Sequence, residues 1–389
     1  MISIDDALSI MNKLNTEPKT ELISIFDVLG RILAEDIISK INMPPFDKSA
    51  MDGYAIIAED TSTKFKVIEI VAAGKFPKHE LNTGQCSKIM TGAPMPKGGD
   101  KVLKVELTKE KDGYMYPTGM DMVNNICYLG EDIKIGEKVL DSGIKLNASS
   151  VGVLASMGLK DALVYKKINI GLVTTGTEIV EPGFSLKNGQ IYNSNAYSIY
   201  SQLKDTCAII NYAGIVGDNK ESTKKVLAKV IDESDVIVIS GGVSMGDFDF
   251  VPIVLKELGV KIHFDRVAIK PGRPTTFGTI GAKAVFGLPG NPVSTFVISE
   301  VFVKGMVYRM MGHKYNPVEL SGILKTNYKR KKAGRASYIP VIYDRGIITI
   351  PEYHGSAHLG VLPKANALLL IGKGVDEIKE GMQVNVRQI

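Results

Sequence analysis

The sequence predicts an α/β protein, in which a doubly wound parallel-sheet domain is joined to β-rich domains and an N-terminal helical arm. Residues 167–312 alternate apolar strand patterns with amphipathic helix patterns, which is typical of a parallel sheet covered on both faces. Residues 44–137 and 313–389 combine short strand patterns with turns rich in glycine and proline, which is typical of small β domains.

Composition and charge place the chain among ordinary globular proteins. Its 389 residues are 44% hydrophobic and 23% charged, which excludes a disordered or collagenous protein. The 47 basic and 42 acidic residues leave a net charge of only +5. This excess is too small to indicate a nucleic-acid partner, but it suits an anionic small-molecule substrate.

Cysteine spacing and hydropathy predict a cytoplasmic protein without a membrane segment. Cys86, Cys127 and Cys207 are far apart and form no C-x-x-C pair, so neither a disulfide framework nor a thiolate zinc site is indicated. The amino-terminal stretch is acidic, and no apolar run approaches the roughly 18 residues that a membrane helix needs.

The first 166 residues show helix patterns at both ends and strand patterns between them. Apolar residues three and four apart predict helices over 4–14 and 25–37. A helix pattern over 147–158 and a strand pattern over 162–168 follow later. We assign 1–43 together with 138–166 to an N-terminal helical or linker domain, and 44–137 to a β-rich domain with strands near 54–60, 65–74, 86–92 and 100–108.

The later elements define an α/β domain and a final β domain. Strand patterns in the α/β domain (167–312) cover 168–175, 208–217, 235–240, 261–269 and 282–289. Helix patterns cover 196–205, 222–234, 250–259 and 293–311. Strand patterns at 338–344, 346–353, 367–374 and 383–389 predict that 313–389 forms a small β-barrel-like or sandwich domain.

Ligands of open parallel sheets bind beyond the carboxyl ends of the strands. Five loops at those ends contain glycine, and all but the last contain a charged residue: 174–178, 216–218, 240–249, 270–274 and 287–294. Each loop alone has a favoured structural interpretation, because loop glycines and helix caps are abundant. Five such loops on one edge favour a common ligand site.

The residue types in these loops favour a magnesium ion and a phosphate-bearing substrate. Carboxylates near cations, without histidine or thiolate, suit Mg²⁺, which takes one or two carboxylates plus substrate phosphates. Glycine N–H groups and the helix start at Pro292 favour an anion. The carboxylates are Glu178, Asp218, Asp247 and Asp249, and the cations are Lys270 and Arg273.

Other motifs indicate less. Neither a P-loop nor a dinucleotide fingerprint is present, which disfavours a P-loop ATPase and an NAD dehydrogenase. His354 and His358 have i, i+4 spacing, but the glycine and serine between them favour a loop over a zinc site. The basic run 329–335 is interpreted as an exposed loop between strands rather than an RNA-binding patch.

Seven segments in the family's order closely resemble the molybdopterin molybdenumtransferase family, to which the C-terminal domain of gephyrin also belongs. Together they are highly specific, although one alone would be weak. They are PPFDKSAMDGYA (44–55), IMTGAPMPKGGD (89–100), GEDI (130–133), TTGTE (174–178), SGGVSMGDFDF (240–250), KPGRPTTFG (270–278) and GLPGNPVS (287–294).

The resemblance implies an elongated homodimer of four-part subunits, with 167–312 as the molybdopterin-binding domain. It implies that adenylylated molybdopterin is cleaved in a Mg²⁺-dependent step that releases AMP, while molybdate is inserted to form molybdenum cofactor. It further implies an active cleft between the α/β domain of one subunit and the β-rich domain of the other. Contacts with molybdopterin adenylyltransferase and molybdoenzyme chaperones are implied as well.

The family's functional positions carry over to single residues. The implied metal ligands are Glu178, Asp218 and Asp249. The implied catalytic residues are Asp52, Asp249, Lys270 and Arg273. The implied substrate-binding residues are Thr91, Asp132, Gly241, Gly242, Ser244, Asn291, Pro292, Ser294, Arg335 and Ser356.

Two positions depart from the family pattern. Arg273 stands where the family has lysine, so a planar fork replaces a point charge. Cys127 stands where the N-x-R-x-x-G-E-D motif has arginine, which removes one cation from the expected oxyanion pocket. The alternatives are a tungsten-inserting enzyme, a molybdopterin-binding scaffold, and an enzyme that uses the same α/β domain on another nucleotide, such as a pyrophosphatase or an adenylyltransferase acting on molybdopterin. The acidic loop residues disfavour the scaffold, and the MDGYA and TGAP segments favour the transferase.

Overall fold

The computed structural model describes residues 1–243 and 250–389. The chain forms two compact units. Unit 1 comprises Met1–Ala34, Gly143–Asn147 and Asp161–Ile389, and unit 2 comprises Glu35–Ser142 and Ala148–Lys160. The division into four domains at the boundaries given above stays a prediction.

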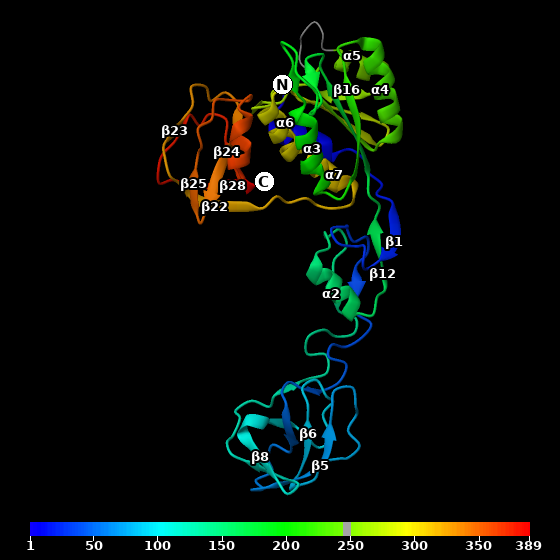
Figure 1. The fold of residues 1–389 in the computed structure, drawn as a ribbon, viewed down its shortest axis with the longest axis vertical. Coiled ribbons are helices and arrows are strands. Elements are labelled where there is room, and N and C mark those ends of the chain that lie inside the picture. The colour runs from blue at the N-terminus through cyan, green and yellow to red at the C-terminus, as the bar shows by residue number, and fades with distance from the viewer. Residues whose placement is uncertain (244–249) are drawn as a thin grey trace. The chain divides into compact units, whose positions relative to one another are not determined.

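Unit 1 contains a six-stranded sheet with helices on both faces, in the order β16-β13-β17-β21-β20-β18. Helices α3, α6 and α7 lie on one face, and α4 and α5 lie on the other (Figure 1). The strands are β13 (Asn169–Thr175), β16 (Ile209–Val216), β17 (Val236–Ser240), β18 (Lys261–Phe264), β20 (Thr276–Ile280) and β21 (Lys283–Leu288). The helices are α3 (Ser194–Lys204), α4 (Lys220–Glu233), α5 (Val251–Glu257), α6 (Pro292–Ile298) and α7 (Lys304–Met310), with the π-helical segment η2 (Ser299–Val303) between α6 and α7.

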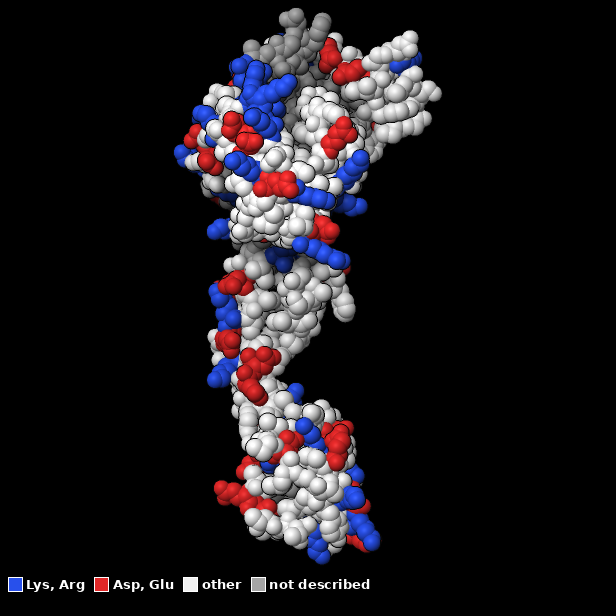
Figure 2. Space-filling model, turned by 90° about the vertical axis from the view of Figure 1, so that its left-hand side faces the viewer, with Lys and Arg blue, Asp and Glu red and all other residues white. Residues whose placement is uncertain are grey.

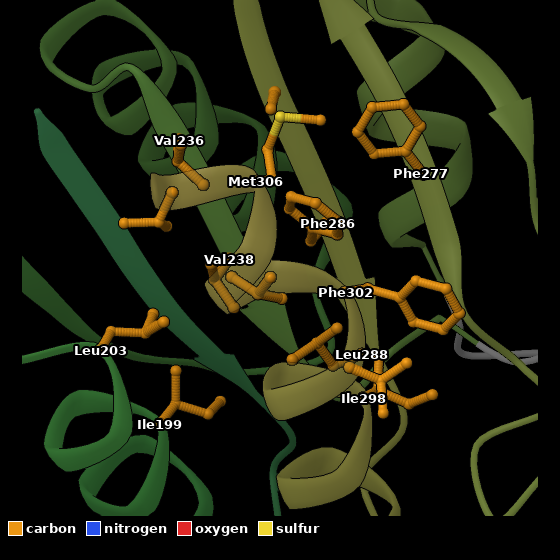
Figure 3. Packing of buried hydrophobic residues seen from close by; sticks show 14 of the residues in the cluster. Ile199, Leu203, Val236, Val238, Phe277, Phe286, Leu288, Ile298, Phe302 and Met306 are labelled. Carbon is orange, nitrogen blue, oxygen red and sulfur yellow. The ribbon is translucent and has the colours of Figure 1, made fainter. Parts of the chain in front are cut away.

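The central strand β17 explains why the strand patterns are apolar throughout. Successive side chains of a strand point to opposite faces. Val236 and Val238 pack with α3 and α6 on one face (Figure 3), while Ile237 and Ile239 belong to the core on the α4 and α5 side. Burial on both faces therefore requires four consecutive apolar residues, and the predicted doubly wound α/β fold is confirmed.

The last two strands in the sheet order, β20 and β18, pair antiparallel, however, whereas the sequence predicts only parallel strands. β13, β16, β17 and β21 run parallel, but β20 pairs antiparallel with β21 and β18 pairs antiparallel with β20. The single strand predicted over 261–269 is wrong, because β18 ends at Phe264 and Ile269 begins another strand. The short reversal between β20 and β21 gives an antiparallel hairpin, which needs no crossover helix.

The C-terminal part of unit 1 is a closed β-barrel. Its sheet runs β24-β25-β22-β28-β26, and β26 pairs back with β24. The strands are β22 (Glu319–Leu324), β24 (Ala336–Asp344), β25 (Ile347–Thr349), β26 (Ala367–Ile371) and β28 (Gln383–Gln388), with β23 (Tyr328–Lys329) pairing β27 (Glu377–Ile378) outside this ring. The turn η3 (Leu359–Lys364) contacts α6 of the α/β domain.

Unit 2 is β-rich, as the strand and turn patterns predicted. Its six-stranded sheet runs β7-β4-β6-β5-β9-β8. The elements are β2 (Ile37–Ile38), β3 (Lys48–Ser49), β4 (Gly53–Ile56), β5 (Phe65–Val71), β6 (Gln85–Ile89), β7 (Lys101–Lys104), η1 (Val105–Leu107), β8 (Thr108–Lys111), β9 (Tyr114–Pro117), β10 (Ile126–Cys127), β11 (Lys138–Leu140) and α2 (Ala148–Ser156).

The N-terminal segment of unit 1 is only partly helical. Ser3 caps α1 (Ile4–Asn12) in a capping box with Asp6, and β1 (Thr20–Ser24) pairs with β12 (Asp161–Tyr165). The helix predicted over 25–37 is wrong. Gly30 has a φ of +75°, which a helix interior does not accept, and Leu33 forms a bridge with Val164. Pairing with neighbouring extended segments therefore overrides the helical pattern.

Candidate active site

Four of the five sequence-predicted loops follow parallel strands of the unit 1 sheet and so lie at the carboxyl ends of those strands, which we call the site edge. The loop 270–274 reaches the same edge for a different reason. It precedes β20, and an antiparallel strand starts at the edge where its parallel neighbours end, so Thr276 lies opposite Gly287 near the end of β21. The prediction that all five loops share one edge therefore holds, although the orientation assumed for the fourth loop was wrong.

A first cavity of about 460 Å³ opens at this edge. Predicted residues that line it are Glu178, Asp218, Gly241, Gly242, Asn291 and Pro292. Among the described residues, neither of the two carboxylates forms an ion pair, so both are available for a ligand. The predicted residues Ser244, Asp247 and Asp249 lie outside the described residues.

Gly241 and Gly242 give the loop after β17 a conformation that is strained for most other residues. Their φ angles are +94° and +63°, in the left-handed region that glycine tolerates best. A Cβ atom on Gly241 would lie 2.5 Å from the Thr175 carbonyl oxygen, and one on Gly242 would lie 2.6 Å from the Thr175 hydroxyl. The backbone here passes directly against β13.

Thr177 fixes the orientation of Asp218. Its backbone N–H and its hydroxyl both donate to Oδ2 of Asp218, each at 3.1 Å. Among the described residues, the second oxygen, Oδ1, has no hydrogen-bond donor. The carboxylate is thus held on one oxygen and available on the other, which is the arrangement of an oriented metal or proton ligand.

Several polar residues of this cavity were not predicted, among them Asn195 and Thr175. Asn195, at the start of α3, lines the cavity and donates to the Gly290 carbonyl at 2.7 Å and to the Ser240 hydroxyl at 3.0 Å. Thr175 also lines it, and its buried hydroxyl has no hydrogen-bond partner among the described residues. An unpaired buried hydroxyl costs about 1–3 kcal/mol. The TTGTE motif contains Thr175 and Thr177, but only its glutamate was selected from the sequence.

A second cavity of about 880 Å³ adjoins the first, since Pro274, Pro289 and Asn291 line both. It lies between the α/β domain and the barrel of unit 1. The predicted residues here are Lys270, Arg273, Asn291, Ser294, Arg335 and Ser356. The acids and the cations therefore line neighbouring cavities rather than the single basin that the sequence predicted.

Strand β19 (Ile269–Lys270) explains how the two domains bring their cations together. It leaves the α/β domain and pairs parallel with β24 of the barrel, with Lys270 opposite Ser337. Arg335 then donates to the Ile269 carbonyl at 3.1 Å. Lys270, on β19, and Arg335, which immediately precedes β24, are distant in sequence but are thereby placed close together.

The loop that carries Arg335 is organised by Arg330. This guanidinium is 6% exposed and donates to the carbonyls of Arg335, Gly372 and Val375 and to the Ser337 hydroxyl. The basic run is a loop between strands, as predicted, but Arg330 is not exposed. Its charge is used inside the barrel edge, while Lys331 and Arg335 line the cavity.

Ser356 connects the barrel to the helix that begins at Pro292. Its hydroxyl accepts from Asn291 Nδ2 at 3.0 Å, and its carbonyl accepts from the Val293 N–H at 3.0 Å. His354 and His358 belong to the same loop, with stacked rings 4.9 Å apart, so the predicted loop is confirmed. No cluster of three or more metal-ligating side chains occurs among residues 1–243 and 250–389.

The second cavity is electropositive. Its lining includes Lys270, Arg273, Lys331 and Arg335, and no aspartate or glutamate of the described residues lines it. On the face shown in Figure 2, lysine and arginine side chains gather over the upper part of unit 1. A small, multiply charged anion is the ligand that such a lining favours.

The remaining predicted residues lie in unit 2. Asp52 Oδ1 accepts from the Thr91 N–H at 2.7 Å and from its hydroxyl at 2.8 Å. These bonds, the N–H first, hold the pKa of Asp52 below its ordinary value. Asp132 donates its N–H to the Met43 carbonyl, and Cys127 pairs with Lys48 between β10 and β3.

Fold and site together define a small-molecule-binding α/β protein, with a carboxylate-lined cavity beside a cationic one. Within the described residues, none of the helices is long and apolar enough to cross a membrane. Comparisons with known proteins identify the family. Residues 2–158 match the MoeA N-terminal region (domain I and II), 171–309 match a probable molybdopterin binding domain, and 323–389 match the MoeA C-terminal region (domain IV).

Relatives of similar length support the same assignment. The chain is 34% identical to a molybdopterin molybdenumtransferase of Haemophilus influenzae, over 99% of this chain and 98% of that protein. It is 32% identical to one of Staphylococcus epidermidis, over 99% and 95%. A crystal structure of a molybdopterin biosynthesis MoeA protein from Pyrococcus horikoshii superposes with a TM-score of 0.86 at 30% identity, covering both chains fully. The chain belongs to the molybdopterin molybdenumtransferase family.

Proposed function

We propose that this protein inserts molybdenum into adenylylated molybdopterin, releasing AMP and forming molybdenum cofactor. Family membership supports a transferase of molybdenum cofactor biosynthesis. The single observation that carries the finer proposal is the pair of adjoining cavities. One offers carboxylates to a metal-bound phosphate group, and the other offers cations to an oxyanion.

We propose that the first cavity binds a magnesium ion. Glu178 and Asp218 are the ligands that we propose, with the free oxygen of Asp218 kept available by the two bonds from Thr177. Two carboxylates plus substrate phosphates are a usual coordination of Mg²⁺. When bound, the ion would neutralise charge on the phosphates during cleavage. We also propose Asp249, which lies outside the described residues, as a metal ligand and catalytic residue.

The neighbouring residues position the two reactants. We propose that Lys270 and Arg273 stabilise the negative charge that develops on the departing AMP, and that Arg335, Ser294 and Ser356 bind molybdate. Because Pro274, Pro289 and Asn291 line both cavities, an oxyanion in the second would lie next to a substrate whose phosphates are held in the first. Fixing two reactants at such a junction converts an encounter in solution into a local step.

Asp52, Thr91 and Asp132 of unit 2 remain proposed participants in the same reaction. At neutral pH the lowered pKa of Asp52 keeps it a carboxylate, so we propose that it accepts hydrogen bonds rather than donates a proton. A homodimer, a cytoplasmic location, and contacts with molybdopterin adenylyltransferase and molybdoenzyme chaperones are also proposed on the family resemblance.

The proposed function is tested by AMP release from adenylylated molybdopterin, with Mg²⁺ and molybdate each added or withheld. We expect release that needs both, and an Asp249→Ala variant with little activity. A variant that kept full activity would refute the metal role of Asp249. Binding of adenylylated molybdopterin without AMP release under any condition would instead favour a scaffold, and faster release with tungstate would favour the tungsten-inserting alternative.

Cys127 gives a separate test of the oxyanion proposal. If the arginine of the family motif contributes to oxyanion binding, Cys127→Arg should lower the molybdate concentration that gives half-maximal AMP release. We expect a several-fold decrease, because one added charge in a protein site contributes about 1 kcal/mol. An unchanged molybdate dependence would show that this position does not contribute to oxyanion affinity. Cys127→Lys serves as a charge-matched comparison.

A further inference from the structure

A third cavity of about 590 Å³ lies beside the first in unit 1. We call it the stacking groove. Its lining consists of uncharged residues from the α/β domain and from the η3 turn of the barrel domain. They are Pro182, Gly183, Tyr192, Asn193, Ser194, Tyr197, Leu359 and Pro363. Its volume falls within the range of about 300–1,000 Å³ that small-molecule pockets occupy.

The stacking groove is continuous with the first cavity. Tyr192, Asn193 and Ser194, at the end of β15 (Ile191–Tyr192) and the start of α3, line both. A molecule whose phosphates lie near Glu178 and Asp218 can therefore extend into the groove without leaving the protein surface. Neither the family motifs nor the loops selected from the sequence include any lining residue of the groove.

Hydrogen bonds fix the two tyrosine rings that border the groove. Tyr197 Oη donates to Glu181 Oε2 at 3.0 Å, and Tyr192 Oη donates to the Phe184 carbonyl at 3.0 Å. The other oxygen of Glu181 accepts from Tyr212 and, at 3.4 Å, from Asn193 Nδ2. Yet Tyr192 and Tyr197 remain 46% and 50% exposed. Their hydroxyls are therefore satisfied, while about half of each residue remains exposed.

Fixed, half-exposed aromatic rings without charged neighbours in the lining suit a flat, uncharged ring system. Stacking on an already ordered tyrosine loses little side-chain entropy, and proline adds rigid apolar surface. A phosphate or an oxyanion would find no cation among the lining residues of the groove, in contrast to the second cavity. The groove and the second cavity thus differ in the part of a substrate that each can hold.

We propose that the stacking groove binds a planar heteroaromatic ring of the substrate, by stacking on Tyr197 and Tyr192, while the attached phosphates occupy the first cavity. This inference rests on the proposed function, because adenylylated molybdopterin carries two such rings, adenine and the pterin. The uncharged, aromatic lining of the groove suits either ring. A protein partner covering the tyrosines is the competing possibility, which the experiment below separates.

The test compares Tyr197→Leu with Tyr200→Leu in the full-length protein. Tyr200 lies on the same helix and is 39% exposed, but it does not line the groove. The probes are AMP, ribose 5-phosphate and neopterin, titrated by calorimetry. Stacking of a base on an aromatic side chain contributes about 1–3 kcal/mol. Tyr197→Leu should therefore weaken the affinity for one ring-bearing probe roughly ten-fold and leave the affinity for ribose 5-phosphate unchanged. Tyr200→Leu should leave the affinities for all three probes unchanged.

A second readout does not depend on losing an interaction. The chain contains no tryptophan, so Tyr197→Trp introduces a single tryptophan at the groove, whose emission can be excited selectively over that of the tyrosines. We expect AMP or neopterin, whichever ring binds there, to quench its fluorescence, and ribose 5-phosphate to leave it unchanged. Loss of AMP affinity alone assigns adenine to the groove, and loss of neopterin affinity alone assigns the pterin.

Unchanged affinity for both ring-bearing probes, with no quenching, would overturn the proposal. A change in molecular mass by light scattering in Tyr197→Leu, with probe affinities unchanged, would assign the groove to a protein contact and also overturn it. These outcomes do not depend on turnover. If AMP release fails in the wild-type protein while ring binding depends on Tyr197, the proposed function fails and the groove assignment stands.

Discussion

Glycine at 241 and 242 shows how single residues determine the shape of the candidate site. Both have positive φ angles, and both pass so close to Thr175 that a side chain would collide with it. The sequence indicated that the N–H groups of these glycines favour an anion, but not that the backbone passes directly against Thr175. The close approach depends on β13 and β17 being neighbours in the sheet, which no local pattern encodes.

Gly241→Ala should lower the free energy of unfolding by about 2 kcal/mol or more, because it adds the strain of a left-handed conformation to a backbone clash. Gly290→Ala is the matched control. Gly290 lines the same cavity, but no heavy atom lies within 4 Å of its added Cβ. Urea denaturation compares the two variants. Equal losses at both positions would contradict the proposed close approach.

The Asp52–Thr91 pair predicts a specific pH behaviour. Hydrogen bonds from Thr91, the N–H first and then the hydroxyl, lower the pKa of Asp52 below 3.8. The stability that these bonds contribute is therefore present above pH 3.8 and is lost as the pH falls through the lower, folded-state value. Thr91→Val removes only the hydroxyl. In this variant the pKa of Asp52 should lie closer to 3.8 than in the wild type but still below it, as followed by carbon NMR of the Asp52 side chain.

A titration of Asp52 in Thr91→Val identical to that of the wild type would contradict the hydroxyl contribution. A value at 3.8 in the variant would show that the N–H bond had been lost as well. Asp60, whose carboxylate accepts from Ser62 and Gly84, is an internal control in unit 2 that the substitution should not affect.

Among the secondary-structure elements, the helical segment α6-η2-α7 carries a buried charge cluster that joins the α/β domain to the barrel. Glu300 is 2% exposed and lies in η2. Its carboxylate accepts from Lys304 at 3.3 Å, from Tyr315 at 3.1 Å and from Arg387 of β28 at 3.2 Å. Arg387 also donates to the Glu300 carbonyl at 2.6 Å. Arg387 thereby attaches the barrel to η2, which directly follows α6, the helix whose Ser294 lines the second cavity.

Glu300→Gln should lower the free energy of unfolding by about 3 kcal/mol, because it leaves the partly buried charges of Lys304 and Arg387 without their counterion. Glu233→Gln is the control. Glu233 forms an i, i+4 pair with Lys229, as Glu300 does with Lys304, but both Glu233 and Lys229 are exposed. A change below about 0.5 kcal/mol is expected there. Comparable effects in both variants, measured by denaturant titration, would contradict a structural role for the Glu300 cluster.

How far the sequence predicts the elements depends on whether local pattern and tertiary contacts agree. They agree for β17, whose four apolar residues are buried on both faces. They disagree for 25–37, where apolar spacing indicated a helix but Gly30 and pairing with Val164 impose an extended path. Strand β20 was missed because TTFGTI follows a glycine and proline turn and is too short for a periodic signal. The position of Lys270 beside the barrel could not be predicted, since it depends on pairing between two domains.

For the whole molecule, the predicted site residues fall into three groups. Glu178 and Asp218 line the carboxylate cavity, Lys270 and Arg335 line the cationic cavity, and Asp52 lies in unit 2. The sequence identified the residue types and the sheet edge. It did not separate acids from cations into two cavities, because that separation arises where the barrel packs against the α/β domain.

The most direct measurement of the central claim is the dependence of AMP release on Mg²⁺ and on molybdate in two variants, Asp218→Asn and Arg335→Ala. If the two cavities have the separate tasks proposed here, Asp218→Asn raises the half-saturating Mg²⁺ concentration at least ten-fold and leaves that of molybdate near the wild-type value. Arg335→Ala does the reverse, since each variant removes a charged ligand contact that contributes about 1.5–3 kcal/mol. If either variant shifted the half-saturating concentrations of Mg²⁺ and molybdate equally, or shifted neither, the separate tasks of the two cavities would be contradicted.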